Sequence, residues 1–457
     1  MKSLSMYKFS HYKEQYKYNL RLALPVVLTQ LGQILTQFAD NIMVGRYGGD
    51  DPVPLAVVSF GGAVFFIIFI ASIGITLGMT PLVGELYAQG DRKKSATLLQ
   101  NGILFYTLLG LGMTVVQFSI IPLMYHLGQP AEVVEMAIPY YRMLACSMPF
   151  IMLFFAFKQF LEGVGNTKVE MVVTIISNMA NIGFNSLFIY GNMGFPEMGA
   201  EGAGLGTLLA RIIASILMIA YFLRKARYRD YLNGFSLLNY SRKTIRQLLR
   251  MGMPIASQMF MEASAFVGTG IMMGWLGTVT MSANHITMIL SNCAFMIVMS
   301  IGAATTIRIS HCYGARNIPD LSLAAKASYH LVLAWNLIAA IAFISLRHYI
   351  PQLFTTNAEV LAVASDLLVF IALFQFSDGI QNVSVGILRG IQDVKIIMPI
   401  AFISYWLLNL PVGYLLGFTL GMGAEGLILG FTFGLSAAAV LLIIRIRRSV
   451  KRLYYNS

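Results

Sequence analysis

Residues 54–82 read PLAVVSFGGAVFFIIFIASIGITLGMTPL, a stretch of 29 residues without a single charged side chain. An α-helix rises about 1.5 Å per residue, so about 20 apolar residues cross the hydrocarbon core of a bilayer. A membrane β-strand would instead alternate apolar and polar side chains over about ten residues. This stretch therefore predicts a transmembrane helix.

The rest of the chain has the same character. Of its 457 residues, 57% are hydrophobic and only 11% are charged, and the mean hydropathy is +0.71. A soluble domain carries about 25% charged residues and a disordered chain is poor in apolar ones, so both classes are excluded. The scattered Cys146, Cys293 and Cys312 predict neither a disulfide framework nor a metal site.

Apolar runs separated by short polar loops predict an all-α polytopic membrane protein. There are twelve such runs, and each is long enough to form a transmembrane helix. They lie near residues 19–45, 54–82, 97–127, 135–160, 168–192, 200–223, 250–275, 281–308, 324–349, 360–387, 396–419 and 424–446.

Basic residues fall on one side of the membrane if the chain has twelve spans. They cluster before the first span, in the even-numbered loops, in the central loop at 224–250 and in the tail, whereas the other side has little beyond Arg46 and Arg347. Because Lys and Arg accumulate on the cytoplasmic side, both termini are predicted to be cytoplasmic. The same bias explains the net charge of +12 without a nucleic-acid partner.

The two halves of the chain repeat each other in collinear order. Because each half holds six spans, the repeat is parallel, and it predicts two six-helix bundles, residues 1–230 and 231–457, joined by the basic loop. Pro25 and Pro254 match and are each expected to open a helix. The other matches, at separations of 224–228 residues, are MGAEG at 198–202 and 422–426, SIG at 72–74 and 300–302, and LxG at 161–163 and 388–390.

Three acidic side chains lie well inside predicted spans. Counting residues to the nearest charged loop places Glu262 and Asp378 near the midplane and Asp40 about 9 Å below the outer surface. A carboxylate at the bilayer centre costs about 2.5–3.5 kcal/mol on insertion scales, so these acids indicate function. No Lys or Arg is expected at matching depth to neutralise them, because Arg142 and Arg211 are placed nearer the helix ends.

Unpaired carboxylates in a low dielectric either hold a proton or bind a cation. Either property suits a transporter driven by protons or by sodium, and Na⁺ is a candidate ligand of Glu262, Asp378 or Asp40. At the repeat offset of 229, Asp40 aligns with Thr269 and Glu262 with Gln33, so the charges do not repeat with the fold. This asymmetry points to function and argues against the symmetric charged ring of a channel.

Amide side chains recur beside these acids at three- and four-residue steps, which places them on common helix faces. Interhelical hydrogen bonding explains such amides as readily as ligand binding does. The candidate lining residues with amide side chains are Gln33, Gln37, Asn181, Asn185, Gln258, Gln375 and Asn382.

Five motifs together resemble the multidrug and toxic compound extrusion (MATE) family, in its NorM-like branch. The resemblance covers roughly residues 20–445. The motifs are Pro25 through Asp40-Asn-Ile-Met-Val-Gly45, Gly252-Met-Pro254 followed by Glu262, Met299-Ser-Ile-Gly-Ala-Ala-Thr305 with Arg308, Gln375-Phe-Ser-Asp378 with Leu388-Arg-Gly390, and Asn181-Ile-Gly-Phe-Asn185.

This resemblance implies an inner-membrane antiporter that exports cationic, amphipathic drugs in exchange for Na⁺ or H⁺ by alternating access, with no other cofactor. It further implies a first-half site formed by Asp40 with Asn181 and Asn185, and a second-half site formed by Glu262 and Asp378. Some relatives carry Tyr one turn before the tenth-helix acid. This chain has Phe374 there, a candidate lining residue that lacks a hydroxyl ligand for a cation.

Other functions make different demands on the sequence. A lipid or lipid-linked saccharide flippase of related architecture is the alternative, and it would need cationic side chains in a central cavity to hold a pyrophosphate. A membrane-embedded enzyme would need a metal cluster or an activated nucleophile, such as HExxH within a span, and the sequence contains no such motif. We expect a monomer that transports small molecules in the lipid bilayer.

Overall fold

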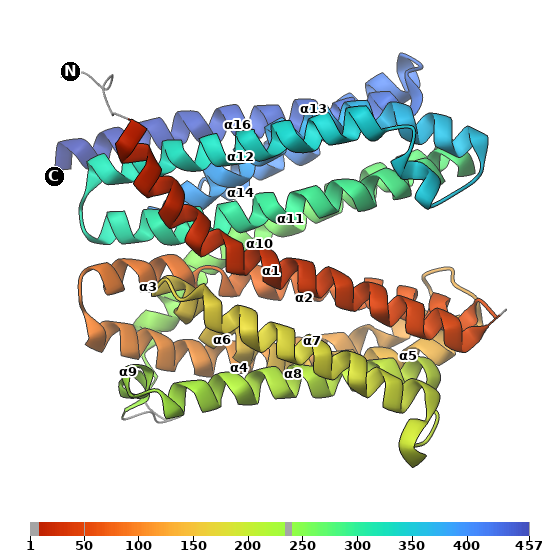
Figure 1. Ribbon diagram of the computed structural model, residues 1–457, viewed down its shortest axis with the longest axis horizontal. Helices are drawn as coiled ribbons and strands as arrows, with labels where there is room; N and C mark the ends of the chain where they lie inside the picture. Colours follow the sequence, from red (N-terminus) through yellow and green to blue (C-terminus); the bar gives the residue numbers. More distant parts are fainter. Residues whose placement is uncertain (1–8, 50, 234–239, 457) are drawn as a thin grey trace. The chain divides into compact units, whose positions relative to one another are not determined.

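The computed structural model describes residues 9–49, 51–233 and 240–456, and every regular element in these ranges is a helix (Figure 1). Chain contacts divide the protein into two compact units, which are called here the N unit, Leu28–Ala256, and the C unit, Met1–Val27 with Ser257–Ser457. Two long helices, α1 (Phe9–Gly48) and α10 (Arg242–Trp275), contribute to both units.

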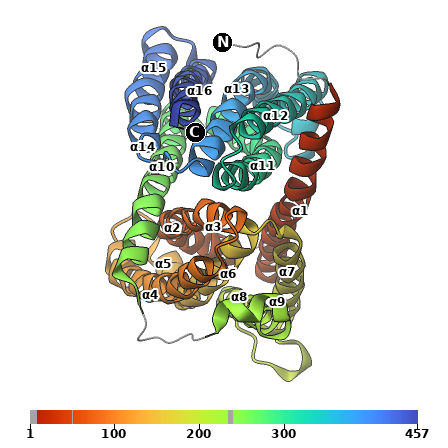
Figure 2. The same ribbon diagram turned by 90° about the vertical axis from the view of Figure 1, so that its left-hand side faces the viewer.

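The N unit is a helical bundle. Within it α7 packs against α8, α4 against α6, and α2 and α8 against α5 (Figure 2). Aromatic side chains fill its interior: Tyr106, Tyr141, Phe160 and Phe222 are fully buried. Besides parts of α1 and α10, its elements are α2 (Val53–Thr76), α3 (Met79–Ala88), α4 (Arg92–Met124), α5 (Ala131–Cys146), α6 (Met148–Gly163), α7 (Thr167–Tyr190), η1 (Asn192–Gly194), α8 (Gly199–Arg224), α9 (Ala226–Arg229) and η2 (Asp230–Leu232).

The C unit is built around α13, which packs against α11, α12 and α16 (Figures 1 and 2). Phe374, Tyr405 and Phe431 belong to its hydrophobic core. Tyr405 lies on a π-helical segment, a feature that is frequent at functional sites. Besides parts of α1 and α10, the elements are α11 (Thr278–Gly314), α12 (Ile318–Leu346), η3 (Ile350–Leu353), α13 (Ala358–Gly390), α14 (Ile397–Ala401), the π-helices η4 (Phe402–Asn409) and η5 (Leu415–Thr419), α15 (Leu410–Tyr414) and α16 (Gly423–Asn456).

The first parts of α1 and α10 each belong to the unit that is formed mainly by the other half of the sequence. Leu22 and Ala23 of α1 pack against Ala304 and Ile307 of α11 in the C unit. In the N unit, the start of α10 lies so close to α2 that a Cβ on Gly74 would meet the backbone of Ala256. The contacts therefore group these two helix ends with the opposite half of the sequence, and the division into bundles 1–230 and 231–457 stays a prediction about the repeat.

Two repeat-related prolines mark the places where this exchange occurs. Pro25 and Pro254 lie inside α1 and α10, so the expectation that each opens a helix is wrong. The two helices begin at Phe9 and Arg242, well before the prolines. Proline removes one backbone hydrogen bond and bends a helix. The unit boundaries follow each proline by two residues, at 27/28 and 256/257.

The twelve predicted spans are all present as helices. Eleven helical segments of the described residues are long and apolar enough to cross a membrane, including Val53–Ala88, which comprises α2 and α3, and Ala131–Gly163, which comprises α5 and α6. The twelfth is α10, whose apolar part is interrupted by the polar side chains of Gln258 and Glu262. The chain is an all-α polytopic membrane protein.

Candidate functional site

Asp40 lies in the N unit, where α7 supplies its partners. Asn185 Nδ2 donates to Asp40 Oδ1 at 2.6 Å. With its amide nitrogen facing the carboxylate, Asn181 donates to the same oxygen at 2.9 Å and accepts from the backbone amide of Thr207 at 3.3 Å. The structure therefore brings together the three residues that the resemblance assigned to a first-half site.

A close approach of α8 to α7 fixes this arrangement. A Cβ on Gly206 would overlap Asn185 Oδ1, so only glycine leaves room for the amide. Asn185 is fully buried, and its Oδ1 has no hydrogen-bond partner among the described residues. The amide is thus held against Asp40 by packing as much as by hydrogen bonding.

A basic side chain, Arg211, acts on Asp40, and the sequence analysis placed it wrongly near a helix end. Arg211 lies at the middle of α8, within electrostatic range of Asp40 and Tyr140. Its guanidinium donates to Ser147 Oγ at 2.6 Å and lies 5.0 Å from the centroid of the Phe65 ring. Counting from both ends of the 200–223 run would have revealed this depth.

Two other predicted residues of the first half lie on α1, seven and three residues before Asp40. Gln33 and Gln37 are exposed on α1 and form no hydrogen bond within the described residues. Their neighbour along the helix, Asp40, is half-buried. In the described residues Asn181 and Asn185 therefore hydrogen-bond Asp40, and the lining role of Gln33 and Gln37 stays a prediction.

The second-half acids lie together in the C unit. Asp378 on α13 is 5% exposed and interacts electrostatically with Glu262 of α10. Its Oδ1 is buried and has no hydrogen-bond partner among the described residues. Burying an unpaired charge is costly, so this oxygen is a strong candidate to hold a proton or to ligate a cation.

Glu262 is held by a short chain of polar groups. Gln258 Nε2 donates to Glu262 Oε2 at 2.6 Å, and Arg389 Nη2 donates to Gln258 Oε1 at 2.9 Å. The guanidinium also acts electrostatically on Glu262. The sequence analysis assigned Arg389 to a loop, but it lies in the last turn of α13 and partly balances the charge of Glu262.

The remaining predicted residues of the C unit have different surroundings. The amide of Gln375 lies 3.4 Å from Ser291 Oγ, and its Oε1 is buried without a partner among the described residues. Asn382 lies against Gly302 of α11. Phe374 is 1% exposed and packs near Phe431 in the hydrophobic core, so its ring contributes to the packing of the C unit.

Tyr405 is the aromatic residue near the acids that the sequence analysis missed. It is fully buried on η4, within electrostatic range of both Glu262 and Asp378. Its hydroxyl has no hydrogen-bond partner of good geometry among the described residues. No motif flagged it, because only the packing of η4 brings it to the acids.

A second group of charges is buried in the N unit, away from every predicted site residue. Lys158 Nζ of α6 lies 2.5 Å from Glu170 Oε1 and 3.7 Å from Glu162 Oε1. Thr80 and Gln159 form a short hydrogen bond beside this group. The group therefore contains two carboxylates and one ammonium, with Glu170 fully buried.

Comparisons with known proteins agree with this architecture. The MatE family model matches twice, at residues 25–187 and 254–415, so the two matches begin 229 residues apart. The chain is 31% identical over 443 residues to "Multidrug resistance protein NorM" of Photobacterium profundum, covering 96% of each chain. The double match confirms the internal repeat.

Solved structures show the same fold. An outward-facing MATE transporter of the MOP superfamily superposes with a TM-score of 0.87 at 20% identity, covering 96% of this chain and 97% of the other. A MOP superfamily transporter from Pyrococcus furiosus superposes with a TM-score of 0.85 at 21% identity, with the same coverage. The chain belongs to the MatE family, the multidrug and toxic compound extrusion transporters that its motifs resemble.

Proposed function

We propose that this protein is a secondary active antiporter that exports cationic, amphipathic compounds in exchange for Na⁺ or H⁺. The observation that carries the proposal is the buried carboxylate of Asp378 beside Glu262, because its Oδ1 has no hydrogen-bond partner among the described residues. A relative with 31% identity is named a multidrug resistance protein, which supports compounds of this class as substrates.

The exchange follows from competition for negative charge. A carboxylate that carries a proton or Na⁺ is neutralised and no longer attracts an organic cation. Release of the ion restores the charge and favours binding of the drug. If the site opens to one side of the membrane at a time, export of the drug is then coupled to entry of the ion.

The oxygen donors near Asp378 suit either ion. Three buried side-chain oxygens on α13 have no hydrogen-bond partner in the part of the chain that the structure describes. They are Gln375 Oε1, Asp378 Oδ1 and Gln381 Oε1, spaced at three-residue steps on one helix face. Hard cations are bound by such carboxylate and carbonyl oxygens, and a proton needs only the carboxylate. Either Na⁺ or H⁺ is therefore the coupling ion in this proposal.

The basic loops give the proposed orientation. The protein is placed in the inner membrane with both termini in the cytoplasm, because Lys and Arg gather in the central loop and at both ends of the chain. In this proposal it works as a monomer, without catalytic activity or a resident cofactor. The transporters found as relatives favour this function over the flippase alternative.

Transport in inverted membrane vesicles tests the proposal. We would measure uptake of a fluorescent organic cation under a sodium gradient alone and under a proton gradient alone, for wild type and Asp378→Asn. The expected result is uptake that follows one gradient and is lost in the variant, although the variant inserts normally. Full uptake by Asp378→Asn would overturn the role of this carboxylate, and no uptake by inserted wild type under either gradient would overturn antiport.

A further inference from the structure

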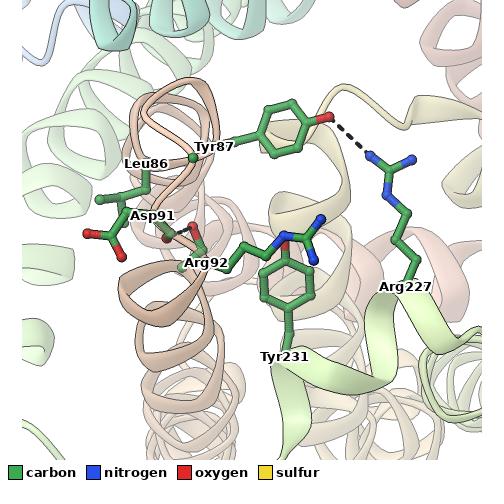
Figure 3. A pocket seen from close by; sticks show the side chains of 8 residues that line it. Leu86, Tyr87, Asp91, Arg92, Arg227 and Tyr231 are labelled. Atoms are coloured by element: carbon green, nitrogen blue, oxygen red, sulfur yellow. Dashed lines mark hydrogen bonds between the residues drawn. The ribbon is translucent and has the colours of Figure 1, made fainter.

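A basic pocket lies in the N unit, where α3, α4, α9 and η2 meet, and none of the acids of the proposed transport site lines it. Its volume is about 400 Å³. Tyr87 of α3, Arg92 of α4, Arg227 of α9 and Tyr231 of η2 surround it (Figure 3). Sequence analysis assigned both arginines only to the general cytoplasmic bias.

The two guanidinium groups converge on this space. Figure 3 shows the Arg92 side chain extending over Tyr231 and the Arg227 side chain reaching toward Tyr87, whose hydroxyl accepts a 3.1 Å hydrogen bond from Arg227 Nη2. Burial raises the pKa of Tyr231 above its ordinary value, and the charges of Arg92 and Arg227 act in the opposite direction. Both guanidinium groups are therefore within electrostatic reach of the Tyr231 hydroxyl, which stays protonated and can donate.

The acid that lines the pocket does not neutralise these arginines. The carboxylate of Asp91 pairs with Lys94 Nζ at 2.8 Å and accepts from the Lys94 backbone amide at 3.0 Å. These hydrogen bonds lower the pKa of Asp91, so the carboxylate stays ionised and paired with Lys94. Within the described residues, neither Arg92 nor Arg227 has a carboxylate within 4.0 Å.

The walls of the pocket are held in place before any ligand arrives. Gln100 Nε2 of α4 donates to the backbone oxygens of Tyr231 at 2.9 Å and Asn233 at 3.1 Å. The Tyr231 ring packs edge-on against Phe160 with 4.9 Å between centroids. Little conformational entropy remains to be lost in this segment on binding.

We propose that this pocket binds the phosphate group of an anionic ligand. Two guanidinium groups can each give paired N–H donors to phosphate oxygens, and the tyrosine hydroxyl can add another donor. Arg227 and Tyr231 of the pocket belong to the basic loop at 224–250 that is predicted to face the cytoplasm, and basic pockets at that surface suit the phosphate of a lipid headgroup. A free phosphate in solution presents the same oxygens, so the test must separate the two sources.

The experiment compares two pairs of substitutions that remove the same charge. Arg92→Gln with Arg227→Gln empties the pocket of positive charge, whereas Lys93→Gln with Arg229→Gln removes two exposed neighbours that do not line it. Purified wild type and both variants are placed in nanodiscs of phosphatidylcholine with a small fraction of phosphatidylglycerol. Native mass spectrometry then counts retained phosphatidylglycerol, with and without added inorganic phosphate.

The expected result is selective retention of phosphatidylglycerol by wild type and by the control pair. The pocket pair should bind at least about tenfold more weakly than the control pair, since diffuse attraction to the anionic surface falls equally in both. Retention that resists inorganic phosphate assigns the site to a lipid headgroup, and displacement by phosphate assigns it to a soluble phosphate. Equal binding by the two pairs would overturn the proposal.

Discussion

Asp40 in the N unit and Asp378 in the C unit are both carboxylates inside membrane-spanning helices, but the protein surrounds them differently. Asn185 and Asn181 occupy Asp40 Oδ1, and Arg211 lies within electrostatic range. Asp378 Oδ1 has no partner among the described residues, and the neighbouring Glu262 adds a second negative charge. Asp40 is thus hydrogen-bonded by side chains of its own unit, whereas Oδ1 of Asp378 has no such partner among the described residues.

The largest expected effect separates these two acids directly. Asp378→Asn should reduce ion-driven transport by about 100-fold or more, equivalent to about 2.7 kcal/mol, because it removes the available charge. The loss of transport in Asp40→Asn should be at least about tenfold smaller than the loss in Asp378→Asn. The reason is that the new amide at position 40 keeps an acceptor oxygen for Asn185. Transport rates in vesicles, normalised to inserted protein, measure both. An equal or larger loss for Asp40→Asn would break the proposed difference between the acids.

The buried charges of the N unit give the next effect, on stability. Lys158→Met should lower the free energy of unfolding by about 3–5 kcal/mol, because Glu162 and Glu170 then lose their buried cation. Thermal unfolding in detergent measures it. Lys94→Met is the control, since it removes one member of an exposed ion pair and should change little. A variant of Lys158 as stable as the control would show that the buried group does not depend on its charge balance.

The packing that holds the Asp40 site predicts a smaller effect. Gly206→Ala should destabilise the protein by about 1–3 kcal/mol and shift Asn185 away from Asp40, because the new methyl group overlaps Asn185 Oδ1. Gly183→Ala on α7 is the matched control. No atom lies within 4 Å of its Cβ, so it should be neutral or slightly stabilising. Both are checked by thermal unfolding; identical shifts would mean that α8 does not hold the amide in place.

The smallest expected effect concerns another pair of repeat-related positions. Asp393 aligns with Asn166 at an offset of 227. Asn166 donates to the Tyr228 hydroxyl at 2.9 Å, whereas Asp393 accepts from Arg445 Nε at 2.7 Å and from Ser449 Oγ at 2.6 Å. Burial raises the pKa of Asp393, but these hydrogen bonds outweigh it and hold the pKa below its ordinary value.

The depressed pKa predicts a defined pH dependence. A carboxyl group with a lower pKa in the folded state stabilises that state above its unfolded pKa of about 3.9, and the stabilisation is lost as the pH falls through the folded value. The stability advantage of wild type over Asp393→Asn should therefore be constant near neutral pH and shrink below about pH 4. Unfolding measured from pH 7 to pH 3 checks this, and an advantage that grows on acidification would contradict it.

Sequence patterns predicted the helices and the repeat well, because hydropathy depends only on composition along the chain. They also found the acids at Asp40, Glu262 and Asp378, since an acid inside an apolar run is rare. The exchange of the starts of α1 and α10 was not predictable in this way, because it depends on which faces pack together. The prolines inside α1 and α10 show the same limit, because a proline pattern does not distinguish a helix start from a bend.

The balance of charge was the main feature that the sequence analysis missed. Lys158, Arg211 and Arg389 were assigned to helix ends or loops, or not considered, because depth was counted from uncertain boundaries. In the structure Lys158 pairs with two buried glutamates, Arg211 lies mid-helix and Arg389 reaches Glu262 through Gln258. Partners of this kind come from other helices, so only tertiary structure reveals that Oδ1 of Asp378 lacks a hydrogen-bond partner among the described residues.

Release of the coupling ion on drug binding is the most direct test of the role proposed for Asp378 and Glu262. Purified wild type loaded with Na⁺, or equilibrated in a weakly buffered solution, would be mixed with a cationic drug while free Na⁺ and pH are recorded. We predict that drug binding releases one of the two ions from wild type, and that Asp378→Asn releases neither. Tight drug binding by wild type with no release of Na⁺ or protons would contradict competition at these carboxylates.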